Sequence, residues 1–185
     1  MSFLSASSSL EAYRQHWEST RGLRLTEQLC KVSHFLCRLR VQMRFGELTR
    51  APLKLVRLEM LGDVVECDWI ARSPDPWDVD LPQRMGMRHA SLQALRDAID
   101  MRALVFSTFS EIDTAHFRVY RASPGKPREM IVTGCVQRND NSSRWVHSLA
   151  MRAKVLGFRF CLEDEVLYEL AGNGKPLPAV DIEAG

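Results

Sequence analysis

The sequence of 185 residues lacks the features that identify membrane proteins and most phosphate-binding enzymes. No window approaches the roughly 18 uncharged apolar residues of a transmembrane helix, so no membrane span is expected. The start, MSFLSASSSL, has neither a basic segment nor an apolar core, which argues against a secretory signal. With only ten glycines, neither GxGxxG nor GxxxxGK[ST] occurs, which argues against phosphate-binding loops of these types. We therefore expect a cytoplasmic protein without contact to a membrane.

The five cysteines are odd in number and form no CxxC pair. Cys30 and Cys37 lie on one predicted helix, about 10 Å apart along its axis, which is beyond disulfide reach. Cys67, Cys135 and Cys161 fall inside apolar, strand-like runs. The pattern predicts five reduced thiols that pack in the core.

The titratable residues show no catalytic or metal-binding spacing. Only His34 and Cys37 are three residues apart, and no second ligand pair accompanies them. His147 and Ser148 are adjacent, but no GxSxG elbow is present. The run DPWDVD holds carboxylates without the order of an EF-hand loop. We expect no cofactor, no metal site and no catalytic residue.

The composition is that of an ordinary globular domain, with 45% hydrophobic and 26% charged residues. A net charge of +2 is too small to imply a polyanionic partner by itself. We predict three parts: an N-terminal helical arm over 1–48, an α+β domain over 49–171, and a mobile tail over 172–185.

A heptad pattern between residues 23 and 45 is the clearest periodic signal in the chain. Six apolar residues at alternating spacings of four and three define a heptad seam: Leu25, Leu29, Val32, Leu36, Leu39 and Met43. The pattern ends at Phe45-Gly46, where the glycine suits a helix C-terminus. Two interpretations compete. The heptad seam either packs on the sheet of its own chain or pairs with the same helix of a second subunit.

Two hairpins, each followed by a helix, are predicted after this N-terminal helix. Residues 53–61 and 64–71 alternate around Gly62-Asp63, a two-residue turn that sets Leu61 opposite Val64. One face of this hairpin is then all apolar: Val56, Leu58, Met60, Val65, Cys67 and Trp69. A loop over 73–88, a helix over 89–110, a second hairpin around SPGKP and a helix ending at Gly157 follow, and EDEVLYEL forms a last helix or extended segment. The fold class is therefore α+β, with an antiparallel sheet packed against helices.

Charge is concentrated in two neighbouring segments. Residues 21–57 hold nine basic and two acidic residues, a local charge of +7, whereas residues 63–80 sum to −5. Arg24, Lys31 and Arg38 repeat every seven residues and form a stripe that could follow a phosphate backbone, with Arg40 and Arg44 nearby. The other interpretation is that the basic and acidic segments face each other, within one chain or across a dimer.

The sequence favours a non-catalytic cytoplasmic interaction domain that acts through protein–protein contact and self-associates as a homodimer. One alternative is a nucleic-acid-binding regulator that uses the basic helix over 21–45. A third, less favoured, is a small enzyme built on Glu59 and Glu66, which the hairpin register places directly opposite each other.

Overall fold

The computed structural model describes residues 26–75, 80–139 and 146–170. The chain divides into two units, residues 1–37 and residues 38–185. Residues 26–37 of the first unit are helical, and so are residues 38–42 of the second. The predicted tail over 172–185 lies outside the described residues. Nowhere in the described ranges is a helix both long and apolar enough to cross a bilayer.

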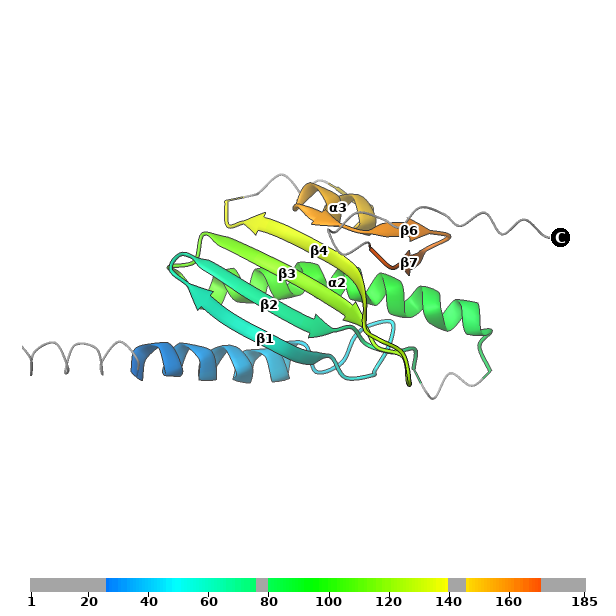
Figure 1. Cartoon of the computed structure of the whole chain (residues 1–185), viewed down its shortest axis with the longest axis horizontal. Coiled ribbons are helices and arrows are strands. Elements are labelled where there is room, and N and C mark those ends of the chain that lie inside the picture. Colours follow the sequence, from blue (N-terminus) through cyan, green and yellow to red (C-terminus); the bar gives the residue numbers. More distant parts are fainter. Residues whose placement is uncertain (1–25, 76–79, 140–145, 171–185) are drawn as a thin grey trace, which may run out of the picture. The chain divides into compact units, whose positions relative to one another are not determined.

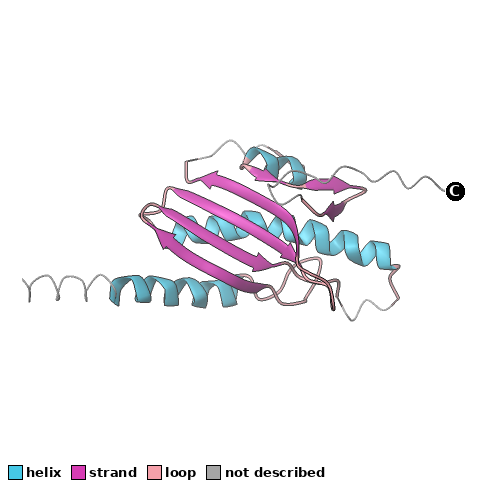
Figure 2. Ribbon diagram, viewed as in Figure 1, coloured by secondary structure: helices cyan, strands magenta, loops and turns pink. Residues whose placement is uncertain are grey.

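The second unit is an α+β fold in which both predicted hairpins are followed by a helix (Figures 1 and 2). Its elements are β1 Lys54–Leu61, β2 Val64–Ile70, α2 Gln83–Thr108, β3 Thr114–Arg121, β4 Glu129–Gln137, α3 Leu149–Val155, β5 Phe158–Arg159, β6 Cys161–Glu163 and β7 Val166–Tyr168. Strands β1 to β5 form one sheet in that order, and β6 and β7 form a separate hairpin. Helix α2 runs behind the sheet in the view of Figure 1 and packs on β3.

The five-stranded sheet is mixed, which corrects the prediction of an antiparallel sheet. Strands β2 and β3 are parallel, from Val64 opposite Thr114 to Ile70 opposite Tyr120, whereas the other neighbours are antiparallel. The cause is the connection between the hairpins. Helix α2 carries the chain back along the sheet, so β3 starts beside the start of β2 and runs in the same direction.

Helix α2 begins at Gln83, inside the segment 73–88 that was predicted to be a loop. Pro82 precedes its first residue, a place where the missing N–H of proline costs no helical hydrogen bond. The predicted loop is correspondingly shorter, and the helix starts at Gln83 rather than at the predicted residue 89.

The first hairpin has the predicted register near its turn and departs from it near its open end. Leu61 lies opposite Val64 and Glu59 opposite Glu66, as predicted. The register then shifts between Leu55 and Arg57, so Val56 is the extra residue of a β-bulge. Val56 is 45% exposed, which corrects its predicted place on the apolar face.

The core lies between the sheet and the helices. Val65, Cys67 and Trp69 are fully buried, as predicted for alternate residues of β2. The Trp69 ring meets the edge of Phe117 at 5.7 Å between centroids, and Phe117 stacks on Phe158 at the same distance. A Cβ on Gly134 would lie 2.8 Å from Cδ1 of Phe158, so the glycine is what lets this ring lie flat on β4.

The segment EDEVLYEL is extended and belongs to the β6–β7 hairpin. Its two turn residues, Asp164 and Glu165, have φ values of 48° and 63°, the left-handed conformation that tight hairpins require. The hairpin is fixed to the rest of the unit through Leu167. The N–H of Leu167 donates to Ser91 Oγ of α2 at 3.0 Å, and its carbonyl accepts from Arg121 Nη2 at 2.6 Å.

Candidate functional site

The sheet face opposite the core carries a row of charged side chains from three strands, here called the open-face cluster: Arg57, Glu59, Glu66, Asp68 and Arg118. Glu66 is its centre. Its Oε2 lies 2.7 Å from Arg57 Nη1 and 2.6 Å from Arg118 Nη2. Arg57 also donates through Nε to Glu59 at 3.0 Å. The two opposed glutamates are therefore each paired with an arginine.

Asp68 extends the open-face cluster toward the interior. Its residue surface is 7% exposed, and its Oδ1 lies 3.1 Å from Arg118 Nε. Burial raises the pKa of the Asp68 carboxyl, although the positive charges of Arg118 and Arg57 act in the opposite direction. In the described part of the chain, no group of three or more His, Cys, Asp and Glu residues is arranged to hold a metal ion.

A histidine and a cysteine continue the same row across the sheet. The strand register places Glu66 opposite His116 of β3, and His116 opposite Cys135 of β4. Cys135 Sγ lies 3.7 Å from His116 Nε2, within hydrogen-bond reach for sulfur, and both residues are exposed. The second hairpin was predicted, but its register was not, because the longer connection around SPGKP does not fix which residues lie opposite each other. The available signal was the alternation in AHFRVYR, which puts His116 and Arg118 on one face.

The basic residues proposed to contact nucleic acid have different environments. Arg24 lies outside the described residues. Lys31 pairs with Glu27, one helical turn away, at 3.0 Å. Arg38 donates through Nη1 to Thr108 Oγ1 at 3.1 Å. Arg40 and Arg44 are exposed, and the Arg44 guanidinium lies 5.0 Å from the centre of the Phe45 ring. The structure thus leaves Arg40 and Arg44 as the more accessible of the four described cations.

The residues of the heptad seam also differ from one another. Leu25 lies outside the described residues. In the first unit, Leu29 is 68% and Leu36 37% exposed, and Val32 is half-buried. In the second unit, Leu39 and Met43 are buried.

Two large apolar side chains off the heptad seam face solvent. Val41 is 80% exposed and Phe45, four residues later, is 61% exposed. Val41 lies in the last turn of the helix, whereas Phe45 lies in the bend just after it. Exposed apolar side chains therefore also occur outside the heptad seam at the end of the N-terminal helix.

The basic and acidic segments are in contact within the chain. Arg57 of the basic segment pairs with Glu66 of the acidic one. The backbone N–H of Arg50 donates to Asp75 Oδ2 at 3.2 Å. These contacts are made by β1 and by the loop before it.

Arg72, the single basic residue of the acidic segment, forms a buried clamp with Asp97 of α2. Its Nε lies 2.9 Å from Asp97 Oδ2, and the two side chains are 0% and 3% exposed. Its Nη1 and Nη2 donate to three carbonyl oxygens, those of Ala51 at 2.7 Å, Met43 at 2.6 Å and Arg44 at 3.3 Å. Burial raises the pKa of Asp97, and Arg72 acts against this rise. Four of the five N–H groups of Arg72 donate to groups of the same chain, which indicates a structural role.

Gln93 joins the same buried clamp from α2. Its Nε2 donates to Asp97 Oδ1 at 2.9 Å, and its Oε1 accepts from the N–H of Leu48 at 2.9 Å. The segment over 43–51 is thereby attached to α2 through side chains rather than through secondary structure.

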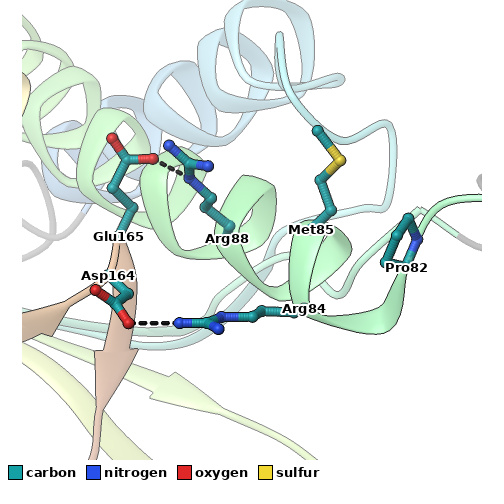
Figure 3. Close-up of a pocket in the computed structure, with 6 residues that line it drawn as sticks. All are labelled: Pro82, Arg84, Met85, Arg88, Asp164 and Glu165. Atoms are coloured by element: carbon teal, nitrogen blue, oxygen red, sulfur yellow. Dashed lines mark hydrogen bonds and ion pairs between the residues drawn. The ribbon is translucent and has the colours of Figure 1, made fainter.

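A cavity of about 570 Å³ opens at the N-terminal end of α2 (Figure 3). It is lined by Pro82, Arg84, Met85, Arg88, Asp164 and Glu165. Arg84 pairs with Asp164 and Arg88 with Glu165, so both cations already have carboxylate partners. The hydrogen bond from Arg88 lowers the pKa of Glu165.

No family model, curated protein or solved structure matches this chain.

Proposed function

We propose that the protein is a non-catalytic interaction domain that acts through protein–protein contact and forms a homodimer through the first part of the heptad seam. The observation that carries the proposal is the exposure of Leu29 and Leu36, one heptad apart on the N-terminal helix. Exposed leucines at this spacing are what a second helix packs against. Leu39 and Met43 are buried within the second unit, so the proposed contact uses residues 25–36.

The state of the opposed glutamates supports an interaction role over catalysis. A general base needs a carboxylate that is free to take a proton, and Glu66 already accepts from two guanidinium groups. Its partner Glu59 is held by Arg57. We therefore place the enzyme hypothesis last.

Light scattering coupled to size-exclusion chromatography tests the homodimer directly. At micromolar concentration we expect the wild-type chain to be a dimer and L29E/L36E to be a monomer, because a glutamate pair cannot be buried in an apolar seam. The matched control is V41S/F45S, which removes two exposed apolar residues outside the heptad seam and should remain dimeric. A monomeric wild-type chain, or a dimer that survives L29E/L36E, contradicts the proposal.

Nucleic-acid binding is the second candidate, favoured by the exposed Arg40 and by the exposed Arg44, whose guanidinium lies against the Phe45 ring. Aromatic and arginine side chains together suit a single-stranded nucleic acid, whose bases stack on them. Fluorescence anisotropy with a single-stranded oligonucleotide should then show binding that weakens with salt and is lost in R40A/R44A. The control is R84A/R88A, which removes the same charge from another exposed site. Equal effects of both variants indicate only non-specific charge attraction.

A further inference from the structure

We propose that Cys135 is a site of reversible thiol–disulfide exchange with small disulfides, and that the imidazole of His116 serves as its base. The proposal concerns the open face of the sheet and is independent of the proposed homodimer. Two observations support it: the distance between Cys135 Sγ and His116 Nε2, and the different surroundings of the other cysteines.

The strand pairing fixes the two side chains beside each other. Cys135 and His116 are direct cross-strand partners in the antiparallel pair of β3 and β4. Partners in such a pair project to the same face, here the face opposite Val132, Gly134 and Val136, which are buried. The resulting distance of 3.7 Å between Sγ and Nε2 allows a proton to pass from sulfur to nitrogen.

Charged side chains lie on the same sheet face as His116. Glu66 lies opposite His116 on β2, and its carboxylate is shared by Arg57 and Arg118. Arg118 is two residues from His116 on β3, and its guanidinium pairs with Glu66 and Asp68 of β2.

None of the other cysteines in the described ranges makes a hydrogen bond to a histidine. Cys67 is fully buried, and burial raises its pKa, so it stays a thiol. Cys161 donates to Glu163 Oε1 at 3.8 Å, and burial together with that carboxylate raises its pKa. Cys30 and Cys37 are exposed on the N-terminal helix, which corrects their predicted place in the core, and His34 lies about one helical turn from each. All five are free thiols in the structure.

The exchange is a balanced two-electron step. His116 Nε2 takes the proton of Cys135, and the thiolate attacks one sulfur of a small disulfide, R–S–S–R. The Sγ–S bond forms as the S–S bond breaks, and the second sulfur leaves as a thiolate that takes the proton back from the imidazolium. Cys135 is oxidised to a mixed disulfide, and one equivalent of the small thiol is produced. Excess small thiol reverses the reaction.

The experiment measures the rate at which each cysteine of the full chain reacts with oxidised glutathione at neutral pH, by mass spectrometry of peptides. We expect Cys135 to be modified about fivefold faster than Cys30. The thiolate is the reacting species, and His116 is placed to take the proton of Cys135. His116→Gln should bring Cys135 to about the rate of Cys30 and leave Cys30 itself unchanged.

The chain contains its own controls for this comparison. Buried Cys67 reports on unfolding, since it reacts only when the core opens, and it should stay unmodified in both proteins. His89→Gln removes a histidine from α2 and should leave the rate of Cys135 unchanged. The proposal is overturned if Cys135 reacts no faster than Cys30 in the wild-type chain, or if His116→Gln leaves their ratio as it was while Cys67 remains unmodified.

Discussion

Two ionic clusters in this protein use the same residue types in opposite environments. In the buried clamp, the side chains of Arg72 and Asp97 are 0% and 3% exposed. In the open-face cluster, those of Arg118 and Glu66 are 34% and 25% exposed. The first cluster joins α2 to the segment before β1, and the second lies along the strands of one sheet.

The difference shows that the number of ion pairs says little about which of them the fold needs. Water can replace a lost partner in the open-face cluster, and salt screens its charges. In the buried clamp, removing one member leaves the other charge, or three backbone carbonyls, without a partner in a dry place. Substitutions in the two clusters should therefore differ in how much they lower the free energy of unfolding.

The largest effect is expected for Arg72→Leu. It should lower the free energy of unfolding by about 3–5 kcal/mol, because it leaves a buried carboxylate unpaired. Urea unfolding followed by circular dichroism measures the change. Arg57→Leu is the matched control in the open-face cluster and should cost much less, because water can reach both of its glutamate partners. Equal losses for the two arginines would remove the distinction between the clusters.

A smaller effect is expected for Gly46→Ala, which tests how tightly the buried clamp is packed. The new Cβ would lie 2.5 Å from Cδ of Gln93 and 2.7 Å from the carbonyl oxygen of Thr49. Relief of that overlap must move the Gln93 amide, so we expect a loss of about 1–3 kcal/mol in unfolding free energy. In a Gln93→Ala background the same substitution should cost less. A full, additive loss in that background would show that Gln93 is not the group displaced.

The smallest effect is a pH dependence that arises at Asp68. Burial raises the pKa of Asp68 in the folded chain above the ordinary aspartate value of about 4. Between the ordinary pKa of the unfolded chain and the higher pKa of the folded chain, Asp68 holds a proton in the folded chain that the unfolded chain has released. The free energy of unfolding therefore falls as pH rises through this window and then levels off. Asp68→Asn should lack this fall in urea titrations over the same window.

Glu59→Gln removes one negative charge from the same sheet face and is the control for the Asp68 experiment. Since its side chain is 46% exposed, the variant should keep the pH dependence of the wild-type chain. Parallel stability curves for the wild-type chain and Asp68→Asn would contradict the assignment to Asp68.

Features that depend on residues close together in the sequence could be predicted. The two-residue turn at Gly62-Asp63 fixed the register of the first hairpin, and so the opposition of Glu59 and Glu66 was predicted correctly. The same rule failed at Val56, because a bulge depends on how a strand fits the twisted sheet rather than on its own alternation.

What could not be predicted follows from pairings between distant residues. Arg118, His116 and Cys135 join the candidate site only because β3 lies parallel to β2 across a helical connection, and neither hairpin by itself implies this pairing. Asp97 had a readable signal: it stands with Gln93 among the apolar residues of α2 that face the core. Its partner Arg72 is 25 residues away in the sequence. Arg72 is the single basic residue of the acidic segment, and nothing in that segment indicates a partner on α2.

The clamp of Arg72 also determines which parts of the chain can open separately. The segment over 43–51 has little secondary structure, yet its N–H and carbonyl groups are tied to Gln93 and Arg72. A local opening of this segment must break the same side-chain bonds that hold the end of β2 to α2. Its amide at Leu48 should therefore exchange with solvent deuterium as slowly as amides of α2, and the segment and the helix behave as one cooperative folding unit.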